Sequence, residues 1–214
     1  EDKWATGSTH YSPRDYLPMN NIEICNLALG RIGVDEINRM DEASQPARIC
    51  TRYFNFTRQN VLRRFPWTFA TKRVQLALLN ETAPDYKYVY QYPSDALAIR
   101  LMYNDSFVGL PKDNYFRIMN GNGGRKIYSN ISNAYVEYTA DVKDSETFDS
   151  QFIEAFSWKL AAEMAFALTG NMNLATNAIQ AYNAYFTEAA GEDAAEDNQE
   201  EAVQDRLANA RWEG

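Results

Sequence analysis

The stretch RRFPWTFATKR, residues 63–73, lies where the hydrophobic pattern of the chain changes. Before Pro66 the apolar residues recur every three or four positions, as on one side of a helix, and after it they alternate, as in a strand. A proline disfavours helical backbone at the residue before it, so Pro66 ends the helix. We therefore expect Pro66, Trp67 and Phe69 to form a structural corner between helical and β structure.

Two helices are predicted before this corner. The first begins after Asn20 or Asn21, either of which can cap its amino end, and Gly33 follows its last turn. The second begins near Ser44 and ends with two arginines, whose charges oppose the negative end of the helix dipole. The inward residues are expected to be Ile22, Cys25, Ala28, Leu29 and Ile32 in the first helix and Ala47, Cys50, Phe54, Val61 and Phe65 in the second.

Residues 67–142 are predicted to form a β domain, because short runs of alternating apolar residues are separated by turn signals. The loop GNGG, residues 121–124, lies between two such runs and indicates a hairpin. The side chains expected on common strand faces are Val74, Leu76 and Leu78; Tyr86, Tyr88, Tyr90 and Tyr92; Leu97, Ile99, Leu101 and Tyr103; and Val136, Tyr138 and Val142.

Two further helices follow. Asp149 is expected to cap the third, Gly170 to end it, and the fourth to begin near Asn173. The predicted fold class is therefore α+β. A four-helix domain, with two helices before and two after, is formed by residues 19–66 and 143–190, and the antiparallel β domain of residues 67–142 is inserted in it. Residues 1–18 are expected to be an extended N-terminal arm or leader, and residues 191–214 an acidic C-terminal tail.

The composition limits the class of protein. At 45% hydrophobic and 14% aromatic residues, the chain can bury a sizeable core. It has no apolar run long enough for a membrane span, and its first residues lack the apolar region of a signal peptide, so we expect a soluble protein made in the cytoplasm. His10 stands alone, and Cys25 and Cys50 are expected to be buried free thiols, so neither a metal site nor a catalytic triad is predicted.

Charge is distributed unevenly along the chain. Residues 43–80 contain seven basic and no acidic residues, whereas residues 160–205 contain no basic residue and become strongly acidic towards their end. The net charge of −8 argues against a protein that coats nucleic acid. The two segments are either solvated faces or complementary patches that join copies of the chain head to tail. The candidate subunit-interface residues are Arg48, Arg52, Arg58, Arg63 and Arg64.

Motifs for catalysis are not found. GNGG lacks the Lys-Ser/Thr of a phosphate-binding P-loop and lies between strands, so a plain hairpin turn is favoured. Asp141, Asp144, Glu146 and Asp149 could supply a carboxylate pair for glycoside hydrolysis, but ending a strand and capping a helix is favoured. We therefore predict no enzyme and no cofactor. The tyrosines, Trp67 and Trp158 could stack on nucleic-acid bases, but packing within the protein is favoured.

Several segments together are similar to one family. The resemblance runs from about residue 20 to about residue 186, and its most specific elements are the Pro-Trp-x-Phe-Ala corner and a Tyr-Pro-x-Asp turn. The segments are ICNLALGRIG (24–33), VLRRFPWTFATKRVQLAL (61–78), YVYQYPSDAL (88–97) and VEYTADVKDSETFDSQFIEAFSWKLAAEMAFALTG (136–170). They resemble the tail tubular protein A group, the head-to-tail adaptors of short-tailed bacteriophages and prophages.

This resemblance implies a structural protein of the virion, located at the junction of head and tail. Adaptors of this group assemble as a ring, commonly dodecameric, beneath the portal protein, lengthen the DNA channel, and dock the tail nozzle or tail fibre proteins. An acidic excess suits a channel through which double-stranded DNA passes without specific binding. Leu207, Arg211 and Trp212 are the expected portal-docking residues, because adaptors of related systems use their C-termini in this way.

Two other functions stay open at this point. One is a tail-associated enzyme that degrades peptidoglycan, which would require two carboxylates facing one cleft. The other is a nucleic-acid-binding module that uses the basic segment 48–73, which would require those arginines on one exposed face.

Overall fold

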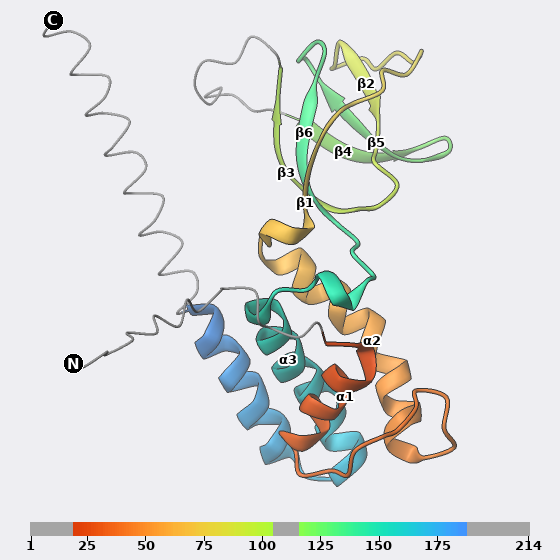
Figure 1. The fold of residues 1–214 in the computed structure, drawn as a ribbon. Coiled ribbons are helices and arrows are strands. Elements are labelled where there is room, and N and C mark those ends of the chain that lie inside the picture. Colours follow the sequence, from red (N-terminus) through yellow and green to blue (C-terminus); the bar gives the residue numbers. More distant parts are fainter. Residues whose placement is uncertain (1–18, 105–115, 188–214) are drawn as a thin grey trace, which may run out of the picture.

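The computed structural model describes residues 19–104 and 116–187. This part of the chain is α+β, with four helices and two small antiparallel sheets (Figure 1). The helices gather at one end of the molecule and the strands at the other, and the chain passes between the two ends twice (Figure 1). The predicted fold class is confirmed at this level.

The helices begin and end at residues that satisfy their exposed backbone groups. They are α1 (Asn21–Gly30), α2 (Gln45–Arg64), α3 (Ser150–Thr169) and a fourth helix over residues 172–187. Asn20 caps α1 through a capping box with Glu23, and Ser44 caps α2. Asp149 caps α3, and Gly170 follows it in the left-handed conformation. These ends agree with the sequence predictions.

The helices share one hydrophobic core. α3 packs against both α1 and α2, and the fourth helix adds Ala178, Tyr182 and Phe186. Fully buried members from the first three helices include Ile24, Cys25, Ala28, Leu29, Cys50, Val61, Leu62, Phe152, Phe156, Leu160 and Met164. Burying a side chain of this size contributes about 1.5–3 kcal/mol, so these residues dominate the stability of the helical end.

The strands form two three-stranded antiparallel sheets, in the orders β1-β6-β3 and β2-β5-β4. A second core lies at this end and includes Tyr90, Met102, Ile127 and Val136. The strands are β1 (Thr71–Gln75), β2 (Tyr88–Gln91), β3 (Ala96–Tyr103), β4 (Phe116–Gly121), β5 (Gly124–Ser129) and β6 (Tyr135–Ala140). The predicted hairpin is confirmed: Gly121 pairs with Gly124 at the turn between β4 and β5.

Two of the strand predictions are wrong in detail. β3 pairs with β6 with register shifts between Ala96 and Ala98 and between Ile99 and Leu101, so its side chains do not alternate regularly. Met102, and not Leu101, is fully buried as a result. Leu78, predicted to share a strand face with Val74 and Leu76, lies beyond the end of β1 and is 61% exposed.

The corner after α2 joins the two ends of the molecule. Trp67 is buried among aromatic rings, with ring centroids 5.0 Å from Phe65, 5.3 Å from Phe152 and 5.9 Å from Phe186. Its indole Nε1 donates to the carbonyl of Val61, one turn back in α2. A short 3-10 turn, η1 (Thr68–Ala70), then leads directly into β1. Trp67 therefore fixes the direction in which the chain leaves the helical end.

No helix within the described residues is both long and apolar enough to cross a membrane.

Candidate functional site

One side of α2 is an exposed basic face. Arg48, Arg52, Phe56, Gln59 and Arg63 follow one another at steps of four, four, three and four residues, which places them on a single stripe of the helix. All five are exposed, and Phe56 has 59% of its surface accessible. We call these five residues the arginine face. An exposed aromatic ring flanked by arginines is the composition found at the centre of protein–protein interfaces.

The charges of this face are not neutralised within the described part of the chain. Arg48 donates to the backbone carbonyl of Ala43, which carries no net charge. None of Arg48, Arg52 and Arg63 forms an ion pair with a carboxylate among residues 19–104 and 116–187, although other arginines there do. The arginine face can therefore attract an acidic surface without first breaking an internal ion pair.

Arg58, a predicted subunit-interface residue, points the other way. It is 1% exposed, and it donates to the carboxylate of Asp141 at 2.6 Å and to the carbonyl of Val142. No guanidinium surface is left for a neighbouring subunit. The structure thus removes Arg58 from the candidate interface and assigns it to the joint between the helical and β ends, because the segment after β6 begins at Asp141.

Arg64 lies at the surface but contacts its own subunit. Its guanidinium carbon is 5.0 Å from the ring centroid of Tyr182 and 4.9 Å from that of Phe186. Cation–π contacts of this kind contribute about 0.5–1 kcal/mol at exposed sites. Arg64 therefore holds the fourth helix against α2 and is a weaker interface candidate than the residues of the arginine face.

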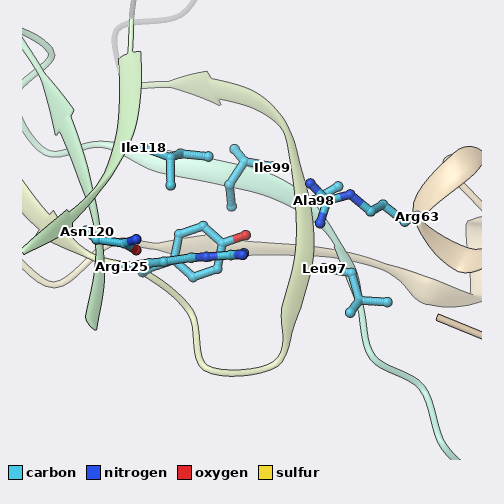
Figure 2. Close-up of a pocket in the computed structure, with 8 residues that line it drawn as sticks. Arg63, Leu97, Ala98, Ile99, Ile118, Asn120 and Arg125 are labelled. Atoms are coloured by element: carbon cyan, nitrogen blue, oxygen red, sulfur yellow. The ribbon is translucent and has the colours of Figure 1, made fainter. Parts of the chain in front are cut away.

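A cleft of about 360 Å³ lies where the end of α2 meets the two sheets. Figure 2 shows Arg63 reaching into it from the helix, with Arg125 and Asn120 on the opposite side and Ile99 and Ile118 between them. We call this the joint cleft. Its lining residues are Arg63, Tyr92, Leu97, Ala98, Ile99, Ile118, Asn120 and Arg125.

The joint cleft combines an apolar floor with a positive rim. None of its lining residues is acidic, and neither Arg63 nor Arg125 is ion-paired within the described residues. Arg100 lies close by and donates to the carbonyls of Arg63 at 2.7 Å and Phe65 at 3.2 Å. Burial, and then the charge of Arg63, lower the pKa of Arg100. The cleft thus offers two cations, Arg63 and Arg125, to an anionic group.

Other candidate residues have structural roles or lie outside the described residues. Asp144 caps a short 3-10 turn, Asp149 caps α3, and Asp141 accepts from Arg58, as the capping interpretation predicts for the first two. Pro66 is exposed, whereas Phe69 packs 5.2 Å from Phe152. The predicted portal-docking residues Leu207, Arg211 and Trp212 lie outside the described residues.

Cys25 and Cys50 are buried free thiols, as predicted. Each donates to a methionine sulfur, Cys25 to Met40 at 3.6 Å and Cys50 to Met164 at 3.4 Å. The hydrogen bond with the adjacent Cys50, and then burial, raise the pKa of Cys25. Among the described residues no group of three or more His, Cys, Asp or Glu side chains is placed to hold a metal ion. The two thiols therefore act as core side chains.

The joint cleft was not predicted from the sequence. Its residues come from α2, β3, β4, β5 and the end of β2, and no local pattern connects them. The one available signal was Arg125, a cation directly after the predicted GNGG turn, but a hairpin tip is a common place for a solvated charge.

Neither a scan against protein-family models nor a search of the curated proteins finds a match for this chain.

Proposed function

We propose that this protein is a ring-forming head-to-tail adaptor of a short-tailed bacteriophage or prophage. The observation that carries the proposal is the arginine face, a row of exposed arginines around Phe56 on α2 that form no ion pair with the described carboxylates. The resemblance of residues 20–186 to tail tubular protein A supports it. The order of elements along the described chain, with two helices before the strands and two after, is compatible with the predicted four-helix domain.

A ring requires two different patches on each subunit, one for each neighbour. The arginine face provides the basic patch. Its partner would be an acidic surface of the next subunit, and residues 160–205, which contain no basic residue, are the part of the sequence best suited to supply it. A central aromatic residue surrounded by charges would give such a contact both affinity and register.

The remaining partners follow from the adaptor role. The ring would lie beneath the portal protein in the virion, extend the DNA channel, and receive the tail nozzle or tail fibre proteins. Leu207, Arg211 and Trp212 are proposed to dock on the portal. Deleting residues 190–214 should then abolish attachment of the ring to portal particles, and unchanged attachment would remove this part of the proposal.

The ring is tested by charge reversal on the arginine face. The double variant Arg48→Glu, Arg52→Glu should fail to form rings with the portal protein of the same virus, as seen by negative-stain microscopy and by light scattering after gel filtration. The matched control is Lys87→Glu, Arg117→Glu, which makes the same change of charge at exposed positions of the β end. Rings in both variants, or rings in neither, would contradict the assignment of the interface to α2.

A second candidate function is nucleic-acid binding, which the unpaired arginines also favour. Neutralising phosphates with several arginines gives an affinity that falls steeply with salt. In a DNA-binding titration at several salt concentrations, the net charge of −8 leads us to expect weak binding. Tight, salt-sensitive binding that is lost in Arg48→Glu, Arg52→Glu would favour this alternative.

A further inference from the structure

The described chain stops beside the end of α2. Phe186 is one residue from the end of the described helix, and its ring centroid lies 5.9 Å from Trp67 and 6.3 Å from Phe65. The guanidinium of Arg64 lies over the same ring, and the neighbouring Arg63 lines the cleft. The described chain thus ends against Arg64, the chain neighbour of an arginine that lines the cleft.

That segment has the complementary charge. Between residues 188 and 205 the sequence contains no basic residue. It contains the acidic residues Glu188, Glu192, Asp193, Glu196, Asp197, Glu200, Glu201 and Asp205, with alanines and Val203 between them. A segment of this composition offers carboxylates and small apolar side chains together.

We propose that the joint cleft binds the acidic segment 188–205 of the same chain. Carboxylates would pair with Arg63 and Arg125 on opposite sides of the cleft, and Asn120 would supply a further hydrogen bond. Alanine or valine side chains would cover Ile99 and Ile118, which lie between the two arginines (Figure 2).

Covalent connection favours this occupant over a free ligand. A segment attached at the joint is present at an effective concentration of the order of mM, so even weak ion pairs would hold it there. An isolated phosphate would satisfy the two arginines but would leave the apolar floor exposed to water. The cleft proposal assigns residues 188–205 to a site on their own chain and does not depend on portal docking. A contact of this segment with a neighbouring subunit is the competing arrangement, which the cross-link below distinguishes.

The test is a zero-length cross-link in the full chain. The variant Arg125→Lys keeps the positive charge and places an amine in the cleft, which carbodiimide can join to a nearby carboxylate. The matched control is Arg117→Lys, because Arg117 is also exposed on the β4–β5 hairpin but does not line the cleft. Circular dichroism confirms that both variants fold, and mass spectrometry of the digested protein identifies the joined residues.

We expect Arg125→Lys to cross-link to residues 188–205 about tenfold more than Arg117→Lys, with a yield that does not change on dilution and falls at high salt. In a mixture of ¹⁴N- and ¹⁵N-labelled chains the joined peptides should carry a single label. Equal yields from the two variants would overturn the proposal, and so would joined peptides of mixed label, which would place the segment in another copy. Mixed label would instead favour the contact with a neighbouring subunit proposed above, whereas equal yields would leave that contact to the charge reversals on α2.

Discussion

Arg58 ties the helical end of the molecule to the β end. Its side chain leaves α2, is buried at the joint, and donates to Asp141 and Val142, which follow the last strand. Gln59 adds a second bond to the same carboxylate at 3.0 Å. A buried charge is tolerated only with such partners, because removing it from water costs several kcal/mol. The relative placement of the two ends therefore depends on this residue.

Replacing Arg58 should destabilise the protein strongly. Arg58→Ala leaves the mostly buried carboxylate of Asp141 without its cation, so we expect the free energy of unfolding to fall by about 3–5 kcal/mol. Urea unfolding followed by circular dichroism measures this change. The control is Arg52→Ala on the exposed side of the same helix, which should change stability by no more than about 0.5 kcal/mol. Similar small effects in both variants would contradict the structural role of Arg58.

The sequence identified the arginines of α2 as candidate interface residues, but not which of them point to solvent and which into the protein. Arg48, Arg52 and Arg58 are all basic residues of one helix, and only the helical phase separates them. Arg58 follows Phe54 by four positions and so lies on the buried side, which could have been predicted from the spacing. Its partner Asp141 lies 83 positions further along the chain, so the ion pair could not have been predicted from the sequence.

The helices were predicted more accurately than the strands. Helix ends depend on local signals, and Asn20, Ser44, Asp149 and Gly170 each act within a few residues of their own position. Strand phase depends on the partner strand. The irregular pairing of β3 with β6 changes which residues of β3 face the core, and no feature of the β3 sequence alone indicates it.

The cap of α3 provides a test at the level of an element. The Asp149 side chain accepts from the backbone N–H of Phe152 at 2.6 Å. Asp149→Asn keeps an acceptor there, so the free energy of unfolding at neutral pH should stay within about 0.5 kcal/mol of the original, whereas Asp149→Ala should lower it by about 1 kcal/mol. Urea unfolding of both variants distinguishes these outcomes. Equal losses in the two variants would show that the hydrogen bond does not matter.

The same residue should make stability depend on pH. Burial raises the pKa of Asp149 in the folded chain, against the opposing effect of its backbone hydrogen bonds. Since the folded state binds this proton more tightly than the unfolded state, the contribution to stability is present at acidic pH and is lost as the pH rises through the raised pKa. The original protein should therefore gain stability relative to Asp149→Asn on acidification. A relative loss, measured by urea unfolding at both pH values, would contradict the direction of the shift.

At the scale of the whole molecule, the arginine face and the joint cleft form one continuous basic region. The arginine face ends at Arg63, and Arg63 also begins the rim of the joint cleft, which continues to Arg125. The sequence predicted a basic segment, but folding was needed to bring a hairpin cation beside it. Arg63 and Arg125 lie 62 positions apart in the sequence, so their placement in one cleft could not be predicted from the sequence alone.

Assembly through this region should depend on salt. Exposed charges interact over a screening length of about 10 Å at about 0.1 M salt and about 3 Å at about 1 M. We therefore expect the proposed rings to dissociate as the salt concentration rises, as measured by light scattering. Phe56→Ser should weaken them at every salt concentration, because the loss of apolar burial is not screened. Rings that are indifferent to salt would indicate an apolar interface elsewhere on the subunit.

The order of elements along the chain has a consequence for synthesis on the ribosome. α2 packs against α3, but every β strand is made between them. Among the described residues, the buried side chains of the β-end core lie between residues 76 and 140, so they have all been made before α3 begins at Ser150. We therefore expect the β end to fold first. Until α3 has been made, the apolar sides of α1 and α2 stay exposed to solvent. Nascent chains of increasing length, probed with protease, should become protected at the strands before they become protected at the first two helices.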